Sequence, residues 1–121
     1  MYEFEWRDQP PPRKLSSWKE APVSPGFYEI GFRQGQSFEP RYGGRAADLT
    51  LRERMRQHWR ESHNKKIRTN RSDLWFRCKE LPSGRVARIV EAHYIAAYDY
   101  PWNGRNEWKE MAMLLEELRT S

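Results

Sequence analysis

The chain has 121 residues, which suits one compact domain and excludes two independent hydrophobic cores. Hydrophobic residues make up 37% and charged residues 32%, but six Trp, six Tyr and five Phe supply enough apolar surface for a folded domain, so a disordered chain is excluded. The net charge of +5 and the isoelectric point of about 9.6 favour an acidic partner such as nucleic acid.

The N-terminal residues 1–25 are predicted to form an arm. Residues 2–6 alternate apolar and acidic side chains, which is the pattern of a short half-buried strand. The three prolines at 10–12 prevent further pairing, because proline has no N–H to donate. We expect the rest of the arm to be extended, with Trp18 as its anchor, and residues 26–121 to form the single domain.

A β-hairpin is predicted to open this domain. Residues 27–32 and 38–42 are the strand candidates, joined by a turn at Gly35. Pro40 indicates that the second strand lies at an edge or contains a bulge. The two glycines at 43–44 are expected to end that strand.

A capped amphipathic helix is predicted next, running to about residue 62. Asp48 or Thr50 can cap it, and Glu53 has the spacing that completes a capping box with Thr50. Its buried stripe is formed by Leu51, Met55 and Trp59. The polar and basic residues 63–72 predict a loop, and residues 74–79 predict a third strand.

Two more helices complete the predicted fold. Residues 85–98 carry apolar side chains on several sides, which predicts a widely buried helix. A final amphipathic helix is predicted by four apolar residues that recur at helical spacing, Trp108, Met111, Leu115 and Leu118. The sequence therefore predicts an α+β domain with a three-stranded antiparallel sheet flanked by helices.

Cys78, the single cysteine, is expected to fill space in the third strand, since it can form neither an intramolecular disulfide nor a thiolate metal site alone. The N-terminus lacks the pattern of a signal peptide, and no apolar run approaches the length of a membrane span. We therefore expect a cytoplasmic protein.

Glu91 is the first candidate for chemistry, because a carboxylate among apolar helix residues is costly unless it is paired or bound to a metal. On the helix alone, an ion pair with Arg88 or another arginine is the simpler explanation.

Arg54 and His58 stand four residues apart and share a helix face. The arginine can stabilise the negative charge of a phosphate, and the histidine can transfer a proton near neutral pH. An exposed basic helix face also explains both residues.

Further candidates are individually weak. Tyr28 and Tyr42 fall on neighbouring strands of the hairpin, where half-buried tyrosines are common. Arg45 follows the two glycines and can reach a phosphate. Asn103 can orient a water or a phosphate oxygen, or form a turn, and Asn106 competes for the same role.

A basic segment over residues 52–71 is expected to attract polyanions by counterion release, or else to be a solvated surface. The residues expected to bind substrate are Arg45, Arg56, Arg60, Lys65, Lys66 and Arg68.

The order and spacing of these residues resemble the GIY-YIG nuclease superfamily over residues 26–106. Gly26-Phe27-Tyr28 and Tyr42-Gly43-Gly44 are similar to its two strand motifs, although Phe27 and Gly43 replace the usual aliphatic residues and the stretch between the tyrosines is slightly long. Arg54 and His58 match its helix pair, Glu91 its single glutamate, and Pro101-Trp102-Asn103 its closing asparagine.

The resemblance implies an endonuclease that hydrolyses DNA phosphodiester bonds with one divalent cation, Mg²⁺ or Mn²⁺, held by Glu91. It implies that one tyrosine, Tyr28 in the first assignment, helps to deprotonate the attacking water, and that Tyr42 positions the water or phosphate, although these two roles can be exchanged. His58, Arg54 and Asn103 are implied to assist. The alternatives are a non-catalytic nucleic-acid-binding module, or a subunit targeted by a protein partner. A homodimer would account for double-strand cleavage, and a bacterial or phage origin is expected.

Overall fold

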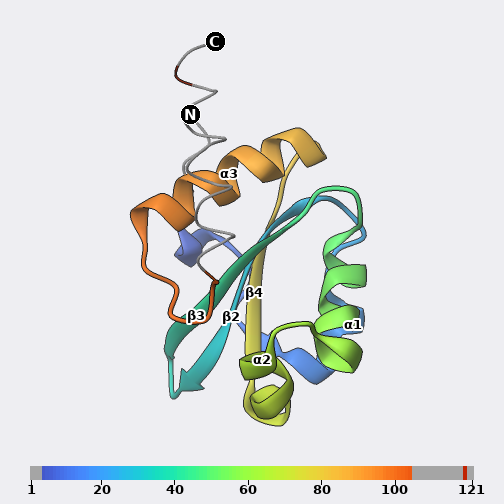
Figure 1. The fold of residues 1–121 in the computed structure, drawn as a ribbon, viewed down its shortest axis with the longest axis vertical. Coiled ribbons are helices and arrows are strands. Elements are labelled where there is room, and N and C mark those ends of the chain that lie inside the picture. The colour runs from blue at the N-terminus through green and yellow to red at the C-terminus, as the bar shows by residue number, and fades with distance from the viewer. Residues whose placement is uncertain (1–3, 105–118, 120–121) are drawn as a thin grey trace.

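A four-stranded antiparallel sheet forms the centre of the protein (Figure 1). The computed structural model describes residues 4–104 and residue 119. The strands are β1 (Arg13–Lys14), β2 (Gly26–Gln34), β3 (Ser37–Ala46) and β4 (Trp75–Glu80), in the spatial order β1-β4-β2-β3. The predicted α+β class with an antiparallel sheet is confirmed. The sheet has one strand more than expected, because Arg13 and Lys14 pair with Phe76 and Trp75.

Helices cover both faces of the sheet. The helices are α1 (Leu51–Glu61), α2 (Lys65–Asn70) and α3 (Gly84–Ala97). Leu51 and Met55 of α1 pack in one core cluster with Tyr28 of β2, whereas Val90 of α3 packs in a second cluster with Phe27. Since Phe27 and Tyr28 are neighbours in a strand, α1 and α3 lie on opposite faces.

Pro40 lies where the hairpin prediction placed it. Strand β3 is at the edge of the sheet, and its register with β2 shifts between Ile30 and Gly31, so that Ile30 pairs with Tyr42 and Gly31 with Pro40. The bulge lets proline enter the strand without breaking the ladder.

The expectation that Gly43 and Gly44 end the strand is wrong. Both continue β3, paired with Glu29 and Tyr28. Tyrosine rings from other segments lie over them: a Cβ at Gly44 would stand 2.4 Å from the Tyr28 hydroxyl, and a Cβ at Gly43 would stand 2.7 Å from the Tyr100 ring. These glycines therefore provide room for side chains on both faces of the sheet.

The helix starts follow their capping signals. Thr50 and Glu53 form the predicted capping box at the start of α1. The expected loop at 63–72 is wrong, because Lys65–Asn70 form a short helix and Arg71–Asp73 a 3₁₀ helix. Asn64 caps α2 by accepting hydrogen bonds from the backbone of Lys66 and Ile67, and Ile67 is fully buried.

The N-terminal segment differs from the predicted extended arm. Phe4 and Glu5 are not in a strand, and Trp6–Asp8 form a 3₁₀ helix. Aromatic burial replaces strand pairing there, since Phe4 and Trp6 pack against the second core cluster. A further 3₁₀ helix, Leu15–Glu20, brings Trp18 against the first cluster, as expected.

The remaining predictions have mixed outcomes. Cys78 is a buried free thiol in β4, and its burial raises the pKa of the thiol to about 11. Among the described residues, no helix is long and apolar enough to cross a membrane. The predicted final helix with Trp108, Met111, Leu115 and Leu118 lies outside the described residues.

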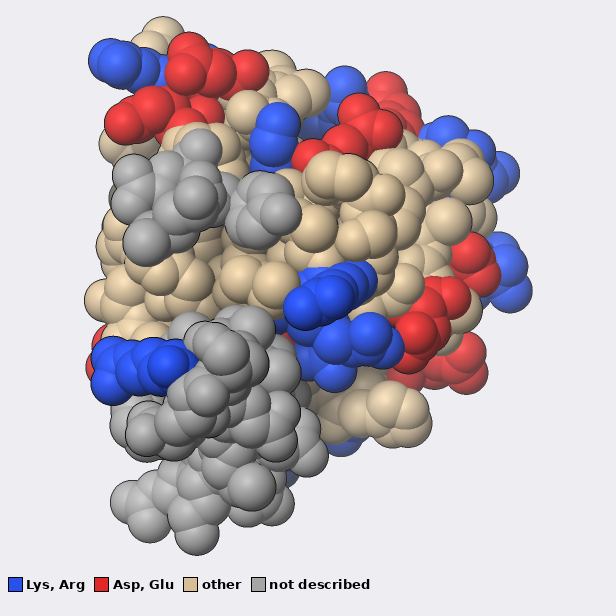
Figure 2. Space-filling model, turned by 90° about the horizontal axis from the view of Figure 1, so that it is seen from above, with Lys and Arg blue, Asp and Glu red and all other residues tan. Residues whose placement is uncertain are grey.

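Charges of both signs appear on the surface seen from above in the orientation of Figure 1. Figure 2 shows basic and acidic side chains next to one another in several groups there, with uncharged surface between the groups. The excess of positive charge is therefore not distributed evenly over this face.

Candidate active site

The Tyr28 hydroxyl connects strand β2 to helix α1. It lies 2.7 Å from Nε2 of His58, and Nη2 of Arg54 donates a hydrogen bond to it over 3.1 Å. Arg54 and His58 share the face of α1 that meets the sheet, as their spacing predicted. A phenol, an imidazole and a guanidinium thus meet at one oxygen atom.

His58 is held as a neutral base. It is 5% exposed, and burial together with the charge of Arg54 lowers the pKa of the imidazole to about 3. Its Nδ1 lies 2.9 Å from Oγ of the buried Ser62. In the tautomer with the hydrogen on Nδ1, His58 donates to Ser62 and accepts a proton from Tyr28 at Nε2.

Arg54 is held as a cation beside the two tyrosines. The charge of Tyr28 raises the pKa of Arg54, against the opposing effect of burial, and the charges of Tyr42 and Glu91 act in the same direction. The Tyr42 ring lies 6.3 Å from the Tyr28 ring and 5.4 Å from the His58 ring, measured between centroids. Developing negative charge in this region would therefore be stabilised.

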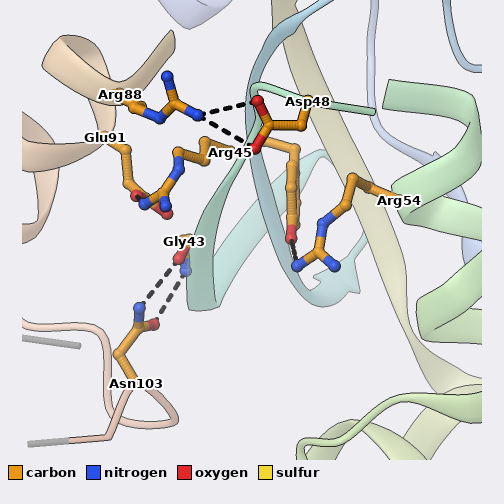
Figure 3. A network of polar contacts seen from close by, with 8 residues as sticks. Gly43, Arg45, Asp48, Arg54, Arg88, Glu91 and Asn103 are labelled. Atoms are coloured by element: carbon orange, nitrogen blue, oxygen red, sulfur yellow. Dashed lines mark hydrogen bonds and ion pairs between the residues drawn. The ribbon is translucent and has the colours of Figure 1, made fainter. Parts of the chain in front are cut away.

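Glu91 lies on the other face of the sheet, on α3, where Oε1 contacts Nη1 of Arg45 from β3 (Figure 3). Arg88, the partner considered first, instead makes two hydrogen bonds to Asp48. The carboxylate of Glu91 is 8% exposed, so its pairing with an arginine is physically required unless a metal replaces it.

The two halves of the site meet around the edge strand. Tyr42 and Gly44 face α1, whereas Gly43 and Arg45 face α3, because alternate residues of β3 point to opposite sides. No strand lies beyond β3 in the described sheet, so Tyr42 and Arg45 lie on the two faces of an edge strand.

Asn103 fixes the loop after α3 to the same edge. Its Nδ2 donates to the Gly43 carbonyl over 2.9 Å, and its Oδ1 accepts from the Gly43 amide over 3.0 Å (Figure 3). The Trp102 amide donates to the Arg41 carbonyl over 2.9 Å. Both polar atoms of the Asn103 side chain thus bind protein backbone.

A pocket of about 570 Å³ opens beside His58. Tyr42, Arg54 and His58 form one part of its wall, and the first residues of α2 and the loop after α3 form another. It is lined by Tyr42, Arg54, Gln57, His58, Glu61, Ser62, His63, Asn64, Lys65, Lys66, Trp102 and Gly104.

The basic residues predicted to bind substrate divide into two groups. Lys65 and Lys66 are exposed and line the pocket. Arg56 is also exposed, while Arg60 lies over the Trp18 ring and Arg68 donates to the Ser62 carbonyl, so these two also support the fold.

Sequence reasoning missed Ser62, Gln57 and Trp102. Ser62 stands four residues after His58 on the helix, a spacing that indicates contact, but serine at a helix end is usually read as a cap. Gln57 accepts from Arg54 over 2.8 Å, at the spacing of neighbours on a helix surface. No local pattern in the sequence indicates that Trp102 lines the pocket.

Glu91 has the chemistry of a magnesium ligand. Mg²⁺ is commonly held by one or two carboxylates, with water and substrate phosphate completing its octahedral shell. Among residues 4–104 and 119, no group of three His, Cys, Asp or Glu side chains could enclose an ion. A single buried carboxylate beside the edge strand β3 fits that mode of binding, provided that Arg45 turns away.

Solved structures of one nuclease domain match the protein over most of its length. The GIY-YIG N-terminal endonuclease domain of UvrC from Thermotoga maritima, bound to its catalytic magnesium, is 25% identical, with a TM-score of 0.59 over 76% of this chain and 98% of that chain. A point mutant of that domain with its catalytic divalent cation is 26% identical, with a TM-score of 0.58 over 77% and 98%.

The chain has the GIY-YIG nuclease fold. No protein-family model matches the sequence, and no curated protein matches it. In this fold the hairpin β2–β3 lies between helices α1 and α3. The hairpin and these two helices carry most of the residues that suggested the resemblance.

Proposed function

We propose that the protein is an endonuclease that hydrolyses DNA phosphodiester bonds with one divalent cation. The observation that carries the proposal is the meeting of Tyr28, His58 and Arg54 at one phenolic oxygen, beside an edge strand whose other face presents Glu91. The likeness to a magnesium-bound endonuclease domain supports it. A structural aromatic cluster would not need a cation and a neutral base on the same hydroxyl.

Tyr28 and His58 are proposed to move the proton of the attacking water. Tyr28 takes it and passes its own hydroxyl proton to Nε2 of His58 over the 2.7 Å contact, while Ser62 keeps the hydrogen of the ring on Nδ1. His58 can take up this proton only after Arg54 has moved away, because burial and the charge of Arg54 lower the pKa of the imidazole. Tyr28 is fully buried, so this assignment requires Arg54 to leave the Tyr28 hydroxyl and turn toward the phosphate. Tyr42 lines the pocket and positions the water or the phosphate.

Charge stabilisation is assigned to Arg54 and Glu91. Arg54 neutralises the charge that develops on the phosphoryl oxygens. Glu91 would hold the cation, Mg²⁺ or Mn²⁺, which when bound supplies Lewis acidity at the scissile phosphate. Arg45 would then be released to contact a phosphate. Asn103 acts through Gly43, by fixing the edge strand.

DNA is proposed as the substrate because the exposed cations Lys65 and Lys66 line the pocket and the matched domain is an endonuclease. One site cuts one strand, so double-strand cleavage would need a homodimer or two successive encounters. Specificity for a target could come from a targeting protein partner.

The decisive experiment incubates supercoiled plasmid with the purified protein in Mg²⁺, in Mn²⁺ and in EDTA. We expect metal-dependent nicking that Glu91→Ala abolishes. Glu39→Ala is the matched control, since Glu39 is an exposed carboxylate on the same strand as Arg45, paired with Arg41. Cleavage by Glu91→Ala would refute the assignment of the metal ligand. A salt-sensitive gel shift without any cleavage would instead support a nucleic-acid-binding module.

A further inference from the structure

We propose that the pocket beside His58 binds one unpaired nucleotide next to the scissile phosphate, with the Trp102 indole as its stacking surface. The preferred substrate would then be DNA in which the strand to be cut is locally unpaired. The inference rests on the proposed function, because it places the scissile phosphate at Tyr42, Arg54 and His58.

Trp102 is fixed in place before any ligand arrives. Its amide donates to the Arg41 carbonyl over 2.9 Å, and its carbonyl accepts from Nδ2 of Asn64 over 2.8 Å. The ring meets Phe32 edge to face, with 5.6 Å between centroids. The half-buried indole also lines the pocket, so a base that stacks on it loses little freedom on the protein side.

Cationic and polar groups complete the pocket for a nucleotide. Lys65 and Lys66 are exposed on its wall, and neither forms an ion pair within the part of the chain that the structure describes. Gln57 accepts from Arg54 through Oε1, while its amide N–H groups make no hydrogen bond to another described residue. Ammonium groups suit phosphate, and a free amide suits a base edge or a phosphate oxygen.

The size of the pocket favours a single nucleotide over a duplex. Its volume of about 570 Å³ falls within the range of small-molecule sites, which extends from roughly 300 to 1,000 Å³. A base reaches such a pocket only after it leaves the helical stack, and this costs least where the strand is already unpaired. Stacking on an aromatic side chain tolerates any base, so the site selects strand structure and not sequence.

Binding in EDTA tests the inference without hydrolysis. Fluorescence anisotropy would compare a labelled duplex with the same duplex carrying a short central bubble. We expect tighter binding of the bubble, and we expect Trp102→Leu to weaken bubble binding about fivefold or more. Leucine keeps an apolar contact with Phe32 but offers no aromatic face. Trp102→Phe should retain most of the preference, and duplex affinity should change by less than roughly twofold in both variants.

Trp75→Ala is the control, because Trp75 is a half-buried tryptophan that does not line the pocket. Equal affinity for bubble and duplex, or an equal loss on both in Trp102→Leu, would overturn the inference. If the protein prefers the bubble, loses this preference in Trp102→Leu and cuts nothing in Mg²⁺, the nuclease proposal fails and the pocket stands as a site for an unpaired nucleotide. If it cuts duplex and bubble equally and binds them equally, the nuclease stands and the pocket proposal fails.

Discussion

The guanidinium of Arg45 contacts the carboxylate of Glu91, a residue 46 positions further along the chain. Arg45 was expected to bind substrate and Glu91 to bind a metal. In the structure the two side chains bind each other, so Arg45 lies where the metal was expected and Glu91 lies where the phosphate was expected. A cation bound at Glu91, as proposed, would have to compete with Arg45 for the carboxylate. The affinity for the metal would then depend on a residue that is not itself a metal ligand.

Arg45→Gln should strengthen metal binding, because it removes the competing positive charge from Glu91. The apparent Kd for Mn²⁺, measured by isothermal titration calorimetry, should fall by about fivefold, which corresponds to roughly 1 kcal/mol. Arg88→Gln is the control, since Arg88 pairs with the exposed Asp48. An unchanged Kd in Arg45→Gln would show that the ion pair does not limit access to Glu91.

Gly44→Ala should damage the site more than the fold. The new Cβ would stand 2.4 Å from the Tyr28 hydroxyl, so the tyrosine must shift away from His58. We expect kcat/KM for DNA cleavage to fall by about 100-fold, and unfolding in urea to lose roughly 1–3 kcal/mol. Ser37→Ala changes an exposed residue of the same strand that does not line the pocket, and it should leave both quantities unchanged. Full activity in Gly44→Ala would contradict the role of the Tyr28–His58 contact.

His58 should make the protein less stable as the pH falls. The folded pKa of about 3 lies below the ordinary value of 6.5, so between these values the unfolded chain binds a proton that the folded chain does not. The contribution is present in full above pH 6.5 and is lost as the pH falls toward 3.

Urea unfolding at pH 7 and at pH 5 measures this loss. The free energy of unfolding should decrease by about 2 kcal/mol more in the native chain than in His58→Asn. His93→Asn changes an exposed histidine and should keep the native pH dependence. Equal slopes for the native chain and His58→Asn would mean that His58 is protonated readily when folded.

Arg77→Met should be among the most destabilising substitutions outside the site. Arg77 pairs at 2.6 Å with the buried Glu29, which also accepts a hydrogen bond from Tyr100. Without Arg77 the carboxylate is buried beside a phenol alone, at a cost of about 3–5 kcal/mol in urea unfolding. The comparison variant Arg88→Met breaks an exposed ion pair and should cost less than about 1 kcal/mol. A small loss in Arg77→Met would indicate that water reaches Glu29.

Local patterns in the sequence were sufficient for the hairpin, the capping box at Thr50 and the helix that carries Glu91. They also placed Arg54 and His58 on one face, because that relation depends only on helix geometry. These predictions succeeded because each of these elements is determined by residues that are close together in the sequence.

The failures came from tertiary contacts. Gly43 and Gly44 were read as strand breakers, yet the rings of Tyr28 and Tyr100 occupy the space that their side chains would need. The helix Lys65–Asn70 depends on the cap at Asn64 and on burial of Ile67, within a segment whose charge suggested a loop. The partner of Glu91 came from a distant strand, which no helical spacing can indicate.

Asn103 has a consequence for how copies of the chain can meet. Its side chain pairs with the N–H and the carbonyl of Gly43, and the Trp102 amide pairs with the carbonyl of Arg41. An incoming strand would otherwise pair with these backbone groups of β3. Sheet extension from one copy to another is therefore blocked at this stretch of the edge. Within the described residues, the contacts of Trp102 and Asn103 therefore oppose edge-to-edge aggregation of copies of the chain through this part of β3.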